Sequence, residues 1–387
     1  MICRSIKNYF IVIFLIFFPF LINCQCNLLY FFNDGPSSID VYNPVSNSII
    51  SNIPTGNNPF LWDIDVTPNA EFIYAAERAS SPPVGINVIE TATNNIIATI
   101  PINGPAAIPI RISMDLSLDG EFLYVINFSL GVSSSTLSVI QTSTNTVTST
   151  IPLGFSPFDV QVSPNGEFVY VLQPLGISII ETSSNSILTT ISVTSPTSLL
   201  FSPNGDFYYV TDPVSNSVLV FDTSSNSILA SIPVGSIPSQ NAIDITPNGE
   251  FIYAANVASN DLSVIEISSN SVIATIPVIA PPTAVKITPN GEFIYVAHSD
   301  SNFPSNSGIT IFRTSDNSIV NTFNSGIFPT LDLVVSPINT NDSCLDTSSI
   351  PTMGEWALIN LVFLLLIFGI VEIKNQHILS SIMLEHS

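Results

Sequence analysis

The sequence contains few charged residues and very few basic ones. Only 9% of its 387 residues are charged, against about 25% in an ordinary soluble domain. Seven Lys and Arg stand against 29 Asp and Glu, so the formal net charge is −22. Such a surface repels phosphate backbones, which disfavours nucleic-acid binding. The acidity is also compatible with a cation partner, but we favour the simpler interpretation that it keeps the protein soluble.

Histidine and cysteine are scarce as well. His298 is the first of three histidines, and the other two follow residue 376. The four cysteines, Cys3, Cys24, Cys26 and Cys344, have no histidine neighbours that would complete a zinc site. No Gly-rich phosphate loop leads from a strand into a helix. We therefore expect no metal, no cofactor and no catalytic constellation.

A repeated phrase dominates the chain: a short polar turn followed by an aromatic strand. Six copies begin with the turn, at Thr67–Tyr74, Ser117–Tyr124, Ser163–Tyr170, Ser202–Tyr209, Thr246–Tyr253 and Thr288–Tyr295. A seventh copy, Asn27–Tyr30, lacks the turn. The tyrosines are 44, 50, 46, 39, 44 and 42 residues apart. A period in the forties with several strands per unit predicts a closed ring of small sheets.

One unit shows the full pattern of four strands. We expect strands at Phe251–Ala255, Leu262–Ile267, Val272–Ile276 and Ala284–Ile287, the first buried on both faces and the second partly alternating. The turn between the second and third strands carries an asparagine that tolerates left-handed geometry, namely Asn47, Asn94, Asn145, Asn185, Asn226, Asn270 and Asn317. Pro277 ends the third strand because proline cannot donate to a sheet. The sequence thus predicts an all-β fold, a seven-bladed β-propeller over residues 27–337.

The two ends of the array predict how the ring closes. The first unit has no preceding fourth-type strand, and the last has an extra one at Leu331–Ser336. We predict that this segment pairs beside Leu28–Phe32 and thereby removes exposed sheet edges. Closure would bring Cys26 and Cys344 to the same region. They form a disulfide there or remain as two free or separately paired thiols.

The strand phrases ending at Asn256, His298 and Asp212 resemble the YVTN-type propeller repeat of bacterial and archaeal surface proteins. The resemblance covers about residues 27–337 and supports the fold. It is less informative about function, because members include surface-layer proteins and similar propellers occur in enzymes and binding proteins.

Both ends of the sequence have features of targeting segments. Residues 1–24 are typical of a signal peptide, with Arg4 and Lys7 before an apolar run. After a linker at 338–349, residues 350–374 hold an apolar stretch of transmembrane type, followed by a tail at 375–387. Pro351, Thr352, Glu355 and Trp356 resemble the IPTL-type C-terminal sorting signal. That resemblance implies processing by an exosortase-type protease, and the alternative is a plain membrane anchor.

Recurring carboxylates are the candidate ligand-binding residues. Counted back from each turn, they occupy two positions of the fourth-type strand: Asp65, Asp115 and Asp244, and two residues earlier Asp63, Asp159 and Asp332. Both positions lie on one strand face, and the resemblance implies that this strand lines the central channel. A ring of acids could hold a cation or a polar ligand. Alternatively, the acids cap neighbouring blades and recur only because the blades are duplicated.

On these grounds we expect an exported protein at the cell surface, possessing a non-catalytic role as a scaffold or recognition module for an extracellular protein or polysaccharide. Two alternatives are kept. One is a propeller enzyme of the lactonase or quinoprotein type with its site at the channel, which the scarcity of basic residues disfavours for anionic substrates. The other is a structural surface-layer protein that assembles through its blade faces.

Overall fold

The computed structural model describes residues 28–33, 38–44, 46–55, 61–77, 85–102, 109–129, 135–236, 243–300, 306–324 and 329–336. Within these residues the chain forms strands β1 to β28 in seven separate four-stranded sheets. Each sheet is a blade, and all the described residues belong to one unit, Gln25–Asp342. The prediction of an all-β, seven-bladed propeller with four-stranded blades is confirmed.

The blades are numbered along the chain. Blade 1 contains β28 (Pro329–Val335), β1 (Leu29–Asn33), β2 (Ser38–Asn43) and β3 (Ser48–Pro54); blade 2 contains β4 (Leu61–Val66), β5 (Phe72–Glu77), β6 (Gly85–Glu90) and β7 (Asn95–Pro101); blade 3 contains β8 (Pro109–Leu116), β9 (Phe122–Ser129), β10 (Ser135–Gln141) and β11 (Thr146–Leu153); blade 4 contains β12 (Asp159–Val162), β13 (Phe168–Gln173), β14 (Gly176–Glu181) and β15 (Ser186–Ile191).

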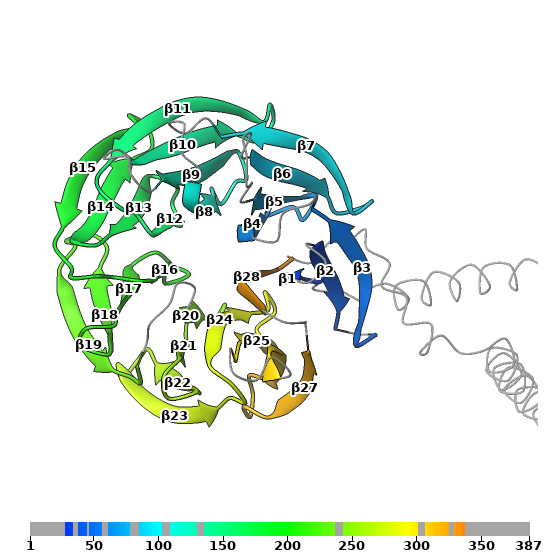
Figure 1. The fold of residues 1–387 in the computed structure, drawn as a ribbon. Coiled ribbons are helices and arrows are strands. Elements are labelled where there is room, and N and C mark those ends of the chain that lie inside the picture. Colours follow the sequence, from blue (N-terminus) through cyan, green and yellow to red (C-terminus); the bar gives the residue numbers. More distant parts are fainter. Residues whose placement is uncertain are drawn as a thin grey trace, which may run out of the picture. The chain divides into compact units, whose positions relative to one another are not determined.

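The remaining blades repeat this order. Blade 5 contains β16 (Leu199–Phe201), β17 (Phe207–Asp212), β18 (Ser217–Asp222) and β19 (Ile228–Pro233); blade 6 contains β20 (Ile243–Ile245), β21 (Phe251–Asn256), β22 (Asp261–Glu266) and β23 (Ser271–Pro277); blade 7 contains β24 (Pro282–Ile287), β25 (Phe293–His298), β26 (Gly308–Arg313) and β27 (Ile319–Asn324). All strand pairs are antiparallel, and the first strand of each blade lies nearest the axis (Figure 1).

The ring closes through blade 1, as predicted. The last strand, β28, pairs antiparallel with β1, with Leu29 opposite Val335 and Phe31 opposite Leu333. Blade 7 then packs on this composite blade, where the Phe323 ring stacks on Tyr42 at 4.7 Å between centroids. The first and last strands of the propeller are therefore joined by hydrogen bonding within one sheet.

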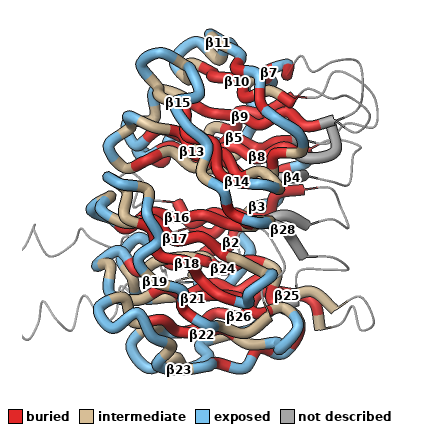
Figure 2. The backbone as a smooth tube through the Cα atoms, turned by 90° about the vertical axis from the view of Figure 1, so that its left-hand side faces the viewer, coloured by how far each residue is buried: buried red, intermediate tan, exposed pale blue. Residues whose placement is uncertain are grey.

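The core lies between the blades rather than within any one of them. The tyrosine of each repeat is buried, and six of the seven, Tyr30, Tyr74, Tyr170, Tyr209, Tyr253 and Tyr295, are less than 2% exposed. Exposed residues gather instead on the outermost strands and turns (Figure 2). The second repeat strand departs from the expected partial alternation. In β22 the residues Leu262–Ile265 are all buried, because a middle strand of a blade has a neighbouring blade on each side.

The turns explain the constancy of the repeated phrase. In each Ser/Thr-x-Asn/Asp turn the hydroxyl of the first residue accepts the backbone N–H of the phenylalanine five residues later, as Thr288 does from Phe293 at 3.0 Å. The asparagine side chain then accepts the N–H of the following glutamate, as Asn290 does from Glu292 at 3.1 Å. The seven asparagines of the outer turns all adopt the predicted left-handed conformation, with φ between 48° and 57°.

Several expectations fall on residues that the structure does not describe. The signal peptide at 1–24, the linker at 338–349, the sorting segment at 350–374 with Pro351 and Trp356, the tail at 375–387 and the cysteine pair all lie outside the described residues. Among the described residues, no helix has the length and hydropathy needed to cross a membrane.

We expect Gly205→Ala to destabilise the fold by about 1 kcal/mol, because an L-residue with a Cβ is strained in the left-handed region. Gly205 has φ of 74°, and an added Cβ would meet Pro164 only at an ordinary 3.6 Å. Backbone strain is then the main cost, and it can be measured as the shift in free energy of unfolding by urea. Gly205→Asn is the matched control, since asparagine tolerates this conformation. Equal losses for both variants would contradict the strain argument.

Candidate functional site: the carboxylates of the central channel

The inner strands place the predicted acids at the propeller axis. Asp63 and Asp65 lie on β4, Asp115 on β8, Asp159 on β12 and Asp244 on β20. Asp63 and Asp159 are buried, with exposed fractions of 9% and 4%, whereas the other three are partly accessible within the ring. Asp332 lies on β28, but the structure does not describe its side chain.

On β4, each carboxylate joins the inner edges of two adjacent blades. Asp63 accepts the N–H of Ile64 at 2.8 Å with one oxygen and that of Met114 in blade 3 at 2.7 Å with the other. Asp65 repeats the arrangement with Val66 at 2.8 Å and Leu116 at 3.0 Å. We call this arrangement a carboxylate bridge.

The bridge recurs around the channel. Asp244 accepts the N–H of Ile245 at 2.9 Å and that of Ile287 in blade 7 at 2.7 Å. Asp115 accepts the N–H of Val162 in blade 4 at 2.6 Å. These bonds satisfy backbone donors that an inner strand directs toward the channel, where it has no further strand beside it.

Asp159 makes a related but richer set of contacts. It accepts the N–H of Val160 at 2.9 Å and, from blade 3, the Ser113 hydroxyl at 3.1 Å. The backbone of Leu199 in blade 5 also donates to it. Its carboxylate therefore touches three successive blades. The acids thus make the contacts with neighbouring blades that we considered as the alternative to ligand binding. Ligand binding by these acids stays a prediction.

The channel environment favours the protonated carboxyl groups. Burial, and after it the negative charge of Asp65, hold the pKa of Asp115 well above its usual value. Burial likewise raises the pKa of Asp244. For Asp159 burial raises the pKa to about 6, against the opposing effect of its hydrogen bonds. Desolvation disfavours a charge more than these backbone donors can offset.

Lys286 is the basic residue that acts on these acids. It lies on β24 at the position that Asp65, Asp115 and Asp244 hold in their own blades. Its positive charge lowers the pKa of Asp115, Asp159 and Asp244. The pattern of recurring acids did not predict a role for this residue. Its opposite charge at a ring position was the signal that could have identified it.

Two further polar residues are Ser113, on an inner strand, and His298, at the end of a second strand. Ser113 holds the ring position of Asp63 in blade 3, so the same alignment could have found it. His298 is fully buried at the end of β25, where Nδ1 contacts the Asn306 carbonyl at 2.8 Å and Nε2 contacts Thr310 Oγ1 at 2.9 Å. Burial lowers its pKa. Both ring nitrogens are engaged within the blade, which indicates a structural role for this side chain.

The carboxylates are spaced by the blades rather than gathered on one point. Within the described part of the chain, no three His, Cys, Asp or Glu side chains are grouped so that they could hold a metal ion. The arrangement offers carboxyl groups with raised pKa values, of which Asp115 interacts electrostatically with Asp65 and Asp159, and all of which are influenced by the charge of Lys286. Such groups are suited to general acid and base roles.

Comparisons with known proteins agree with this architecture. The family model described as "Lactonase, 7-bladed beta-propeller" matches residues 180–318, which is less than half of the chain. A search of the curated proteins gives no match. Solved structures that resemble the fold include hydrazine synthase from Kuenenia stuttgartiensis, with a TM-score of 0.61 and 17% identity over 75% of this chain and 93% of that one.

Two further solved structures are enzymes or are described as such. A candidate 6-phosphogluconolactonase from Bacteroides uniformis has a TM-score of 0.63 and 16% identity, covering 81% of this chain and 100% of that one. The dihydro-heme d1 dehydrogenase NirN has a TM-score of 0.57 and 12% identity, covering 80% of this chain and 75% of that one. At these identities the likeness shows the fold.

The comparisons correct the functional expectation. The prediction of a non-catalytic scaffold, and with it the prediction that the chain is not an enzyme, is wrong, because the lactonase family model that matches residues 180–318 favours the lactonase alternative. The physical reason lies in the channel. Histidine is scarce in the sequence, but burial raises the pKa of Asp159 to about 6, which gives the channel a group that titrates near neutral pH.

We expect Asp63→Ala to destabilise the protein by about 2 kcal/mol, since it leaves the buried N–H groups of Ile64 and Met114 without this acceptor. Urea denaturation followed by circular dichroism measures the change. Glu292→Ala is the control, because Glu292 is an exposed turn residue and its removal should cost less than about 0.5 kcal/mol. A similar loss for the two variants would show that the bridge contributes nothing.

We expect stability to rise as the pH is lowered from about 7 toward 5. The folded pKa of Asp159 is about 6 against an ordinary 3.8, so in this window the folded state binds the proton that the unfolded state releases. The effect of this one group is at most about 3 kcal/mol. His298, with its lowered pKa, acts in the opposite direction.

His298 contributes equally to wild type and to Asp159→Asn, so its contribution cancels in the difference between their free energies of unfolding. The difference in unfolding free energy between them should change with pH between about 4 and 6 and be flat above about pH 7. A difference independent of pH throughout would contradict the raised pKa.

Proposed function

We propose that this protein is a propeller hydrolase of the lactonase type that acts at its central channel. The observation that carries the proposal is the placement of Asp115 and Asp159 on neighbouring inner strands, with raised pKa values, within the field of Lys286. The lactonase family match over residues 180–318 supports the reaction class. The likeness in fold to a candidate 6-phosphogluconolactonase is consistent with it.

The chemistry follows from the two acids. Asp159, with a pKa of about 6, is suited to act as base near pH 7, and Asp115 is assigned as the acid because burial and the charge of Asp65 raise its pKa and favour its protonated form. The oxygen of water bonds to the lactone carbonyl carbon while its proton passes to Asp159. The ring C–O bond then breaks, and the ring oxygen takes a proton from Asp115. A proton passing from Asp159 to Asp115 restores both groups and leaves a hydroxy acid.

Lys286 has an electrostatic role in this proposal. Negative charge develops on the carbonyl oxygen as water adds, and a nearby ammonium group offsets that charge in a site of low dielectric constant. The overall charge of −22 disfavours negatively charged substrates. Phosphorylated lactones approach against this field, so we infer that the substrate is an uncharged lactone.

The test is hydrolysis of glucono-1,5-lactone compared with its 6-phosphate, each corrected for spontaneous hydrolysis at the same pH. We expect a higher kcat/KM for the uncharged lactone and a rate that rises with pH through an apparent pKa near 6. Asp159→Asn should lower kcat by about 10²-fold or more. Proton release measured with a pH indicator at low buffer concentration gives the rates.

Glu292→Gln serves as the matched control, because it removes one carboxylate from an exposed turn away from the channel and should leave kcat unchanged. The proposal is overturned if none of the lactones is hydrolysed faster than in buffer. It is equally overturned if Asp159→Asn and wild type have the same kcat.

We further propose that the enzyme works outside the cell. Support comes from the sequence: the signal-peptide pattern of residues 1–24, the sorting-signal resemblance around Pro351 and Trp356, and the YVTN-type repeat phrases. Intact-mass spectrometry of the protein from its native host tests this directly. A chain that keeps residues 1–24 would exclude cleavage of the signal peptide.

A further inference from the structure

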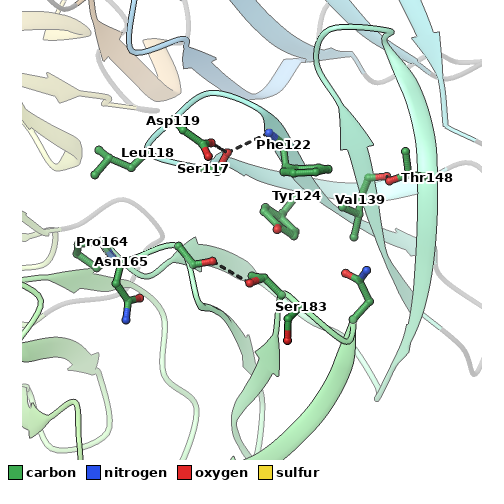
Figure 3. A pocket seen from close by; sticks show the side chains of 13 residues that line it. Ser117, Leu118, Asp119, Phe122, Tyr124, Val139, Thr148, Pro164, Asn165 and Ser183 are labelled. Carbon is green, nitrogen blue, oxygen red and sulfur yellow. Dashed lines mark hydrogen bonds between the residues drawn. The ribbon is translucent and has the colours of Figure 1, made fainter.

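A hollow of about 590 Å³ lies between blades 3 and 4, apart from the channel acids (Figure 3). Its walls are the turn after β8, the aromatic start of β9, residues of β10 and β11, and two turns of blade 4. None of the channel carboxylates lines it. Its size is within the range of roughly 300–1,000 Å³ that small-molecule sites occupy.

The repeat is broken at this hollow. Five sister turns begin with proline and asparagine after the Ser or Thr, whereas the turn of blade 3 has Leu118 and Asp119. Both departures line the hollow, and Leu118 is 70% exposed. Leu118 thus presents apolar surface at the edge of the hollow, where a bound ligand can cover it.

A buried acceptor inside the hollow has no partner. In two sister positions the asparagine of an outer turn accepts a hydrogen bond from the tyrosine of the preceding blade, Asn145 from Tyr74 at 3.4 Å and Asn317 from Tyr253 at 3.2 Å. Here Asn185 Oδ1 is buried without any hydrogen bond. A buried oxygen of this kind costs about 1–3 kcal/mol unless a donor reaches it. Asn94 Oδ1, in the corresponding turn of blade 2, is buried without a hydrogen bond as well, so this feature belongs to the repeat, and at Asn185 the side chain also lines the hollow.

The remaining lining combines aromatic rings with neutral polar groups. Phe122 and Tyr124 lie on the blade 3 side of the hollow, Thr148 lies farther toward the outer strand of that blade, and Ser183 lies opposite Tyr124 on the side of blade 4 (Figure 3). Asp119 provides one negative charge, and hydrogen bonds from the Ser117 hydroxyl and the Glu121 N–H lower its pKa. Among the described lining residues there is no Lys, Arg or His. Anionic ligands therefore find no partner charge here.

We propose that this hollow binds an uncharged saccharide of about disaccharide size. The apolar face of a sugar ring covers Phe122 and Leu118, since aromatic side chains offer large flat apolar surfaces. Sugar hydroxyls donate to the exposed Asp119 carboxylate, and they exchange hydrogen bonds with the Thr148 and Ser183 hydroxyls that also line the hollow. This site is independent of the proposed hydrolysis in the channel, so either can fail without the other.

The experiment is saturation-transfer NMR and calorimetric titration of the full chain with cellobiose, maltose and N,N′-diacetylchitobiose, with lactobionate as the anionic comparison. We expect at least one uncharged disaccharide to bind, with a Kd of about 1 mM or tighter, and lactobionate to bind at least tenfold more weakly. The double variant Leu118→Pro with Asp119→Asn restores the turn of five sister blades, so it should fold. It should weaken binding at least tenfold.

Asn185→Gly removes a side chain that lines the hollow while keeping a residue that tolerates its φ of 51°. We expect it also to weaken binding, whereas the matched variant Asn270→Gly, in the corresponding turn of blade 6, should leave binding unchanged. Three results overturn the proposal: no uncharged disaccharide binds up to about 20 mM, lactobionate binds equally well, or neither hollow variant weakens binding.

Discussion

The structure depends on the burial of each blade between its two neighbours. A four-stranded sheet whose middle strands are apolar on both faces cannot cover itself, so every blade requires another on each side. The buried tyrosines of the repeat mark this constraint in each blade. In a closed ring each of the seven blades has a neighbouring blade on both faces. The pairing of β28 with β1 is therefore the step that makes the last interface possible.

Closing the ring leaves backbone N–H groups of the inner strands without a neighbouring strand at the axis. The side chains that accept these groups also determine the chemistry of the channel. Seven inner strands direct backbone N–H groups toward the channel, where no further strand can accept them. The carboxylates of Asp63, Asp65 and Asp244 each bridge two such edges. The same placement removes water from the acids and raises the pKa of Asp115 and Asp159. Structural bridging and potential reactivity thus have one physical origin.

Departures from the repeat locate the distinctive sites. Lys286 stands where three other blades have aspartate, which introduces a positive charge beside raised-pKa acids. Ser113 stands where Asp63 and Asp159 stand in their blades and donates to Asp159. Leu118 and Asp119 replace proline and asparagine at the hollow between blades 3 and 4. Residues that the repeat conserves within this chain serve folding, and the exceptions distinguish one blade from another.

The sequence by itself determined the blade number, the four strands of each blade, the left-handed asparagine turns and the partner of the closing strand, because these follow from local periodicity and turn chemistry. It also placed the acids on one face of the inner strands. It did not determine what their oxygens contact, since Met114 and Leu116 reach Asp63 and Asp65 only when two blades lie side by side. Nor could it reveal the raised pKa of Asp159 or the unpartnered Asn185. Desolvation and hydrogen-bond satisfaction are properties of the assembled ring, so only the tertiary structure decided them.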